Sequence, residues 1–108
     1  MNLAELIPNI ACENTMFECI DFLDRNNSEV WLKTVSGFAN SKGGTFYIGV
    51  EDKTNTLIGF SQKDADNERN YFNNQVNEHI YPRPEIIFDF IPYKTEDSEL
   101  FIIKIYII

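Results

Sequence analysis

Basic residues are scarce in this sequence, which has 9 Lys and Arg against 17 Asp and Glu and a formal net charge of −8. Proteins that coat nucleic acid by neutralising its phosphates normally carry a basic surface, so the overall balance counts against that class. Contact with a polyanion would have to depend on a local cluster of cations rather than on net charge.

Cysteine and histidine are also scarce, and Cys12, Cys19 and His79 are the full set. Two cysteines without a second pair or clustered histidines make no zinc site and no disulfide framework. We interpret them as reduced thiols that pack as small hydrophobic groups in a cytoplasmic protein. His79 lies beside the apolar face of an expected helix with no partner motif nearby, which favours a structural histidine at or near the surface.

Long apolar runs are absent as well. No segment approaches the ~20 apolar residues of a membrane span, and the N-terminal MNLAELIPN lacks the basic start and apolar centre of a signal peptide. The chain instead has 44% hydrophobic and 14% aromatic residues in a length of 108. This composition predicts one globular domain with a packed core and no membrane segment.

Hydrophobic periodicity predicts strands interleaved with helices. The β-branched and aromatic run 45–50 is typical of a buried strand, and we expect 56–60 to return beside it as the second arm of a hairpin. The full expected set is a helical turn at 3–7, strands at 16–23, 45–50, 56–60, 85–93 and 99–108, and helices at 27–42 and 61–81. The order β-α-β-β-α-β-β predicts an α/β (α+β) domain, a mixed β-sheet with two packed helices.

The pair Gly43-Gly44 follows the first long helix, whose last turn is expected to contain Lys42. Glycine permits the positive φ that commonly follows a helix C-terminus. The amides of the pair would lie at the negative end of the helix dipole, so a structural turn is favoured over an anion site. Trp31 and Phe38 share the apolar side of that helix, and we expect them in the core rather than on a base-stacking surface.

The sequence ends in FIIKIYII, a segment of high β-propensity with no charged tail. Such a strand lies between other strands, pairs with another copy of the chain, or belongs to a chain that continues in a longer protein. We favour the last arrangement, an N-terminal fragment, and take a homodimer through this edge as the second. Charge added at Ile105 or Ile107 would then break the dimer.

The block WLKTVSGFANSKGGTFYIGVED, with an acid-containing strand before it and LIGF after it, resembles the Schlafen AlbA-type domain. That domain is a DNA-binding domain at the N-terminus of many bacterial transcriptional regulators. The matching positions are Glu13, Glu18, Phe38, Ala39, Asn40, Gly43, Gly44, Gly49, Val50, Asp52 and Gly59. The resemblance runs from about residue 12 to the end, and it implies that 1–108 is a single domain that precedes further C-terminal domains.

The resemblance also implies a carboxylate site. Schlafen proteins that cleave RNA have three carboxylates, and the matching residues here are Glu13, Glu18 and Asp52. Such oxygen ligands would hold Mg²⁺ or Mn²⁺ for hydrolysis of a phosphodiester. Ile20 stands where the family typically has a lysine, which counts against catalysis and against backbone binding. In the alternative interpretation these acids and Glu51 are surface residues around a turn, and the domain has no cofactor.

Four basic residues are the candidates for contact with nucleic acid. Lys33 and Lys42 flank the first long helix, Lys53 lies in the hairpin turn, and Arg83 lies in the YPRP loop. Four such cations would give weak, salt-sensitive and sequence-independent binding to DNA or RNA. The resemblance therefore favours a nucleic-acid-binding regulatory domain of a transcriptional regulator. The alternatives are a divalent-metal-dependent ribonuclease and a dimerisation or protein-interaction module.

Overall fold

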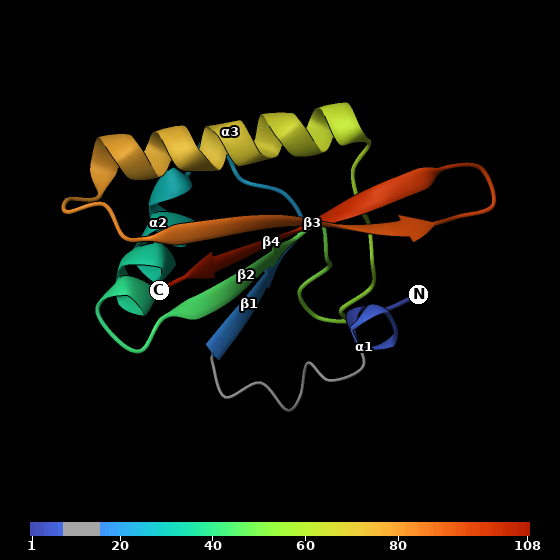
Figure 1. Cartoon of the computed structure of the whole chain (residues 1–108), viewed down its shortest axis with the longest axis horizontal. Helices are drawn as coiled ribbons and strands as arrows, with labels where there is room; N and C mark the ends of the chain where they lie inside the picture. Colours follow the sequence, from blue (N-terminus) through green and yellow to red (C-terminus); the bar gives the residue numbers. More distant parts are fainter. Residues whose placement is uncertain (8–15) are drawn as a thin grey trace.

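The computed structural model describes residues 1–7 and 16–108, in which helices and strands alternate (Figure 1). The elements are α1 (Leu3–Leu6), β1 (Met16–Ile20), α2 (Ser28–Ala39), β2 (Gly44–Ile48), α3 (Gln62–His79), β3 (Ile86–Lys94) and β4 (Glu99–Ile107). The strands form one mixed sheet in the order β1-β2-β4-β3. β1 and β2 are parallel and connected by α2, whereas β4 is antiparallel to both of its neighbours. The predicted class, a mixed sheet with two packed helices, is confirmed.

Two hydrophobic clusters lie on the two faces of the sheet. Alternate side chains of β2 point to opposite faces, so Phe46 packs with α2 and α3 while Tyr47 packs with α1. Trp31 and Phe38 are each 4% exposed and belong to the cluster under the helices, which confirms their predicted place in the core. Inside this cluster the Trp31 ring stacks on Phe72 of α3, with ring centroids 5.1 Å apart.

The Gly43-Gly44 turn is required by packing. Gly43 has a φ of +87°, and a Cβ there would overlap the carbonyl oxygen of Ile107. A Cβ at Gly44 would lie 2.5 Å from the ring of Phe38. The N–H of Gly43 donates to the Phe38 carbonyl and closes α2 at Ala39, so the prediction that Lys42 lies in the last helical turn is wrong. The pair is a structural turn.

The prediction of a strand at 56–60 is also wrong. Among the described residues this segment forms only isolated bridges, between Asn2 and Thr56, between Val50 and Leu57, and between Phe60 and Phe101 of β4. Gly49 and Gly59 have φ values of +100° and +73°, which interrupt the extended backbone that a hairpin ladder needs. The observed order α1-β1-α2-β2-α3-β3-β4 therefore replaces β-α-β-β-α-β-β.

The last strand is not an edge of the sheet. β4 lies between β2 and β3, and Ile105 and Ile107 are both 0% exposed. The predicted homodimer through this strand is therefore wrong in its geometry, because charge at these positions would disrupt the core rather than an interface. Among the described residues, no helix is both long and apolar enough to cross a membrane.

Candidate nucleic-acid interface and acidic pocket

A pocket of about 320 Å³ opens where β1 and β2 end and α2 begins. Crevices at the carboxyl ends of parallel strands are common ligand sites in α/β folds. The pocket is lined by five carboxylates and by no Lys or Arg. We call it the acidic pocket, and its carboxylates are Glu18, Asp21, Asp24, Glu51 and Asp52.

Glu18 and Asp52, two of the three carboxylates predicted to converge, both line this pocket. Both carboxylates are also close enough to Cys19 to affect its thiol. Burial in the first place, and then the negative charges of Asp52 and Glu18, raise the pKa of the Cys19 thiol from 9.0 to about 11. Glu13, the third predicted carboxylate, lies outside the described residues.

The described part of the acidic pocket does not form a complete metal site. Mg²⁺ requires several oxygen ligands at close and regular distances. In residues 1–7 and 16–108, no group of three His, Cys, Asp or Glu side chains is close enough to hold a metal ion. Ile20, at the position of the family's lysine, packs against the cluster under α2 and α3. The pocket therefore lacks a cation at that position.

Glu51 has a structural use inside the pocket. Its Oε2 accepts hydrogen bonds from the backbone N–H of Thr54 at 2.7 Å and from Oγ1 of Thr54 at 2.8 Å. The backbone hydrogen bond, followed by the side-chain one, lowers the pKa of the Glu51 carboxyl. Glu51 thus stabilises the turn that carries Asp52 and Lys53.

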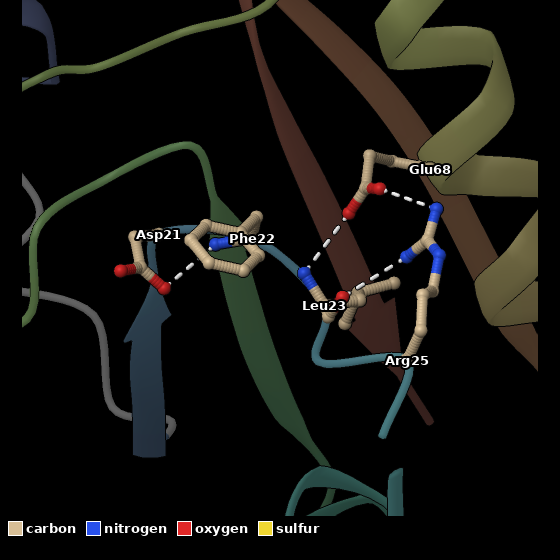
Figure 2. Close-up of polar contacts among 5 residues, drawn as sticks. All are labelled: Asp21, Phe22, Leu23, Arg25 and Glu68. Atoms are coloured by element: carbon tan, nitrogen blue, oxygen red, sulfur yellow. Dashed lines mark hydrogen bonds and ion pairs between the residues drawn. The ribbon is translucent and has the colours of Figure 1, made fainter. Parts of the chain in front are cut away.

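The loop between β1 and α2 is fixed to α3 by a buried carboxylate (Figure 2). Glu68 is 8% exposed, and its Oε2 accepts a hydrogen bond from the N–H of Leu23 at 3.0 Å. Its Oε1 forms an ion pair with Nη2 of Arg25 at 2.6 Å, and Arg25 also donates to the Leu23 carbonyl. The guanidinium lies 3.8 Å from the ring centroid of Tyr71. These contacts position the loop that supplies Asp21 and Asp24.

Sequence reasoning missed this set of contacts, although the sequence contained a signal. Glu68 lies on the same helical stripe as Ala65 and Phe72, where an apolar residue is the rule. An acid on such a stripe indicates a buried partner. The identity of that partner, Arg25, depends on how α3 crosses the sheet and is not visible in the sequence.

A second pocket, of about 310 Å³, lies at the opposite end of β2, between the end of α2 and the loop after α3. Arg83, His79, Tyr81, Ser36 and Asn40 supply its polar groups, and no Asp or Glu lines it. We call it the acid-free pocket. A neighbouring pocket of about 440 Å³ shares Ser36, His79 and Ile80 with it and is lined by Lys33 and Glu29. The two together form the α2–α3 groove.

Arg83 is held in a fixed orientation. Its Nη2 donates to Oδ1 of Asn73 at 2.7 Å, its Nε donates to Oδ1 of Asn77 at 2.5 Å, and its Nη1 donates to the carbonyl of Pro84 at 3.2 Å. None of the carboxylates in the described part of the chain forms an ion pair with Arg83. The guanidinium is therefore held by neutral partners, in a pocket that no Asp or Glu side chain lines.

Comparison with known protein families identifies the family of this chain. The profile of the Schlafen, AlbA_2 family matches residues 13–107. The chain belongs to this family. It is also similar to an uncharacterised ATP-binding protein of Ureaplasma parvum, with 29% identity over 55 residues. That match covers 51% of this chain and 16% of the relative, so it concerns a small part of the longer protein.

In this AlbA_2 domain the four candidate cations do not form one patch. Lys33 and Arg83 line the α2–α3 groove. Lys42 is exposed in the turn that precedes Gly43. Gly43 in turn packs against the end of β4, near the acid-free pocket. Lys53 lies in the turn beside Glu51, at the other end of β2. The structure thus separates Lys53 from the other three.

The asparagines that hold Arg83 were overlooked in the sequence. The outer face of α3 is rich in asparagine, a composition that is typical of a solvated surface without function. Asn73 and Asn77 are four residues apart, which places them on one side of a helix. Their common side faces the YPRP loop, and this arrangement appears only when α3 and the loop are seen together.

Proposed function

We propose that this AlbA_2 domain binds the phosphate backbone of nucleic acid along the α2–α3 groove, as the nucleic-acid-binding regulatory part of a transcriptional regulator. The observation that supports the proposal is Arg83, a fixed cation with no ion pair among the described residues, in a pocket without Asp or Glu. In a chain of net charge −8 this pocket is a local exception, and local potential governs where a polyanion docks.

The chemistry of Arg83 suits phosphate. An arginine side chain has about five N–H donors in a planar fork, which matches phosphate oxygens. The contacts with Asn73, Asn77 and Pro84 use one donor on each nitrogen and leave the remaining N–H groups of Nη1 and Nη2 free for a ligand. Because the fork is already oriented, little side-chain entropy is lost on binding. Lys33 and Lys42 add charge along the groove and at its end.

The test is a binding titration with short labelled nucleic acid at low salt, followed by fluorescence anisotropy. The double substitution Lys33→Gln and Arg83→Gln should weaken binding at least about tenfold, because each charge-assisted hydrogen bond contributes about 1.5–3 kcal/mol. It should also make the slope of log K against log salt shallower by about 0.7–0.9 for each phosphate that the variant no longer neutralises.

Two substitutions of exposed lysines serve as controls for this test. Lys94→Gln removes a cation at the far end of β3 and should leave the affinity unchanged. Lys53→Gln removes a cation at the acidic-pocket end of β2. It should have a small effect on the affinity, because Lys53 lies away from the α2–α3 groove. An equal decrease in affinity for all variants, or an unchanged affinity in the double variant, would refute the groove as the binding surface.

A divalent-metal-dependent ribonuclease is the second proposal, because Glu18 and Asp52 line one pocket at the carboxyl ends of β1 and β2. Structured RNA is incubated with the domain in Mn²⁺ or in EDTA. The proposal expects cleavage in Mn²⁺ alone, abolished in Asp52→Ala and retained in Asp89→Ala, which changes an exposed acid on β3. Cleavage that survives Asp52→Ala excludes this site.

A further inference from the structure

Tyr81 is the most exposed large hydrophobic residue among the described residues, with 98% of its surface accessible to solvent. Single exposed hydrophobic residues are ordinary and need no explanation. Tyr81 differs from them in its position, because it lines the acid-free pocket two residues before the fixed Arg83. No aromatic or cationic side chain of the described residues stacks on its ring. Both faces of the ring are thus available to a ligand.

The surroundings of Tyr81 narrow the class of ligand. Arg83, Ser36 and Asn40 line the pocket, and the Tyr81 side chain at the same site stands out into the solvent. The pocket volume of about 310 Å³ is at the low end of the ~300–1,000 Å³ range of small-ligand sites. These features suit one nucleotide, whose base offers a π-face and whose phosphate offers oxygen acceptors.

We infer that the acid-free pocket binds a nucleotide of a single strand, with the base stacked on Tyr81 and its phosphate held by Arg83. The inference rests on the proposed function and adds the substrate class to it. In a duplex each base is stacked between its neighbours, so its faces do not reach a protruding tyrosine. An unpaired base exposes a face, and stacking on it is tolerant of sequence.

The experiment compares labelled oligothymidylate as a single strand with the same strand annealed to oligodeoxyadenylate. Wild-type protein should prefer the single strand. Tyr81→Ala should weaken single-strand binding by roughly 5- to 150-fold, the range of one base–aromatic stack, with duplex affinity nearly unchanged. Tyr81→Phe keeps the ring and should restore the affinity. Because the side chain is 98% exposed, these variants are expected to fold normally.

Tyr81→Trp gives a direct readout of stacking. The exposed indole should be quenched by the single strand and not by the duplex, whereas Trp31, 4% exposed in the core, supplies a constant background that wild-type protein measures. Quenching by the single strand, together with rescue by Tyr81→Phe, supports the inference.

The failures of the two proposals are distinguishable. If Tyr81→Ala binds the single strand as wild type does, or if wild type prefers the duplex, the stacking inference is overturned. In that case the proposed function still stands, provided that Arg83→Gln weakens binding. If wild type binds neither probe at low salt, the proposed function fails and the inference fails with it.

Discussion

The two ends of β2 carry opposite local charge. At the end where β1 and β2 finish, the acidic pocket has five carboxylates and no Lys or Arg. At the other end, the acid-free pocket has Arg83 and no Asp or Glu. The net charge of −8 averages over this difference. Composition therefore counts against a protein that coats nucleic acid, and it leaves open a domain that touches nucleic acid at one place.

The two pockets also differ in how they are held together. Arg83 is positioned by Asn73 and Asn77, which lie ten and six residues before it in the chain. The loop of the acidic pocket is positioned by Glu68, which lies 45 residues after its partner Leu23. The first arrangement depends on one helix and the turn that follows it. The second depends on the packing of α3 across the sheet, so it should be the more sensitive to a single change.

The largest effect on stability is expected from Glu68→Ala. The change leaves the N–H of Leu23 without its acceptor and Arg25 without its ion pair, in a region where Glu68 is 8% exposed. Removal of these partners should lower the free energy of unfolding by about 2–3 kcal/mol. Urea denaturation measures the decrease.

A neighbouring ion pair on α3 provides the matched control for Glu68→Ala. Asp66→Ala removes a carboxylate that lies 3.8 Å from Arg69 with both side chains more than 40% exposed. Such surface pairs contribute about 0–1 kcal/mol, so this variant should stay close to wild type. If Glu68→Ala is no more destabilising than Asp66→Ala, the loop is not held by α3 in the way described.

The sequence predicted the main elements because their signals are local. The apolar spacing of α2, the β-branched run of β2 and the Gly43-Gly44 turn each depend on residues a few positions apart. The segment 56–60 has a β-propensity similar to that of β2, but the positive φ of Gly49 and Gly59 prevents a ladder of paired strands. Composition does not determine these backbone angles. The central place of β4 is one of three arrangements that the sequence leaves open, because strand order is set by tertiary packing.

The candidate site was predicted less completely, for the same physical reason. Family resemblance supplied Glu18 and Asp52, and the structure brings them into one pocket. The resemblance was also the reason to consider four cations as one group. The structure places Lys53 at the end of the sheet opposite to the other three. Glu68 fixes one pocket by a contact between α3 and the loop after β1, and Asn77 fixes the other by a contact between α3 and the loop that follows it. Such partners become visible only when the elements are assembled.

A smaller effect, on the pKa of Cys19, tests whether the acidic pocket is as negative as its lining suggests. Burial first, then Asp52 and Glu18, raise this pKa from 9.0 to about 11. Since the unfolded thiol loses its proton at lower pH than the folded one, the contribution of Cys19 to stability is complete below pH 9.0 and decreases as the pH rises to about 11. Burial raises the pKa of Tyr93 and acts in the same direction.

Asp52→Asn removes one of the charges that raise the pKa of Cys19 and should lower that pKa, although burial keeps it above 9.0. The Cβ chemical shift of Cys19, followed by NMR during a pH titration of a Cys12→Ser background, measures the change. Asp89→Asn, on β3, is the control and should leave the titration unchanged, because Asp89 is not among the groups that shift Cys19. An identical titration in Asp52→Asn and wild type would mean that Asp52 does not reach the end of β1. The convergence of Asp52 with Glu18 at this end of the sheet would then be refuted.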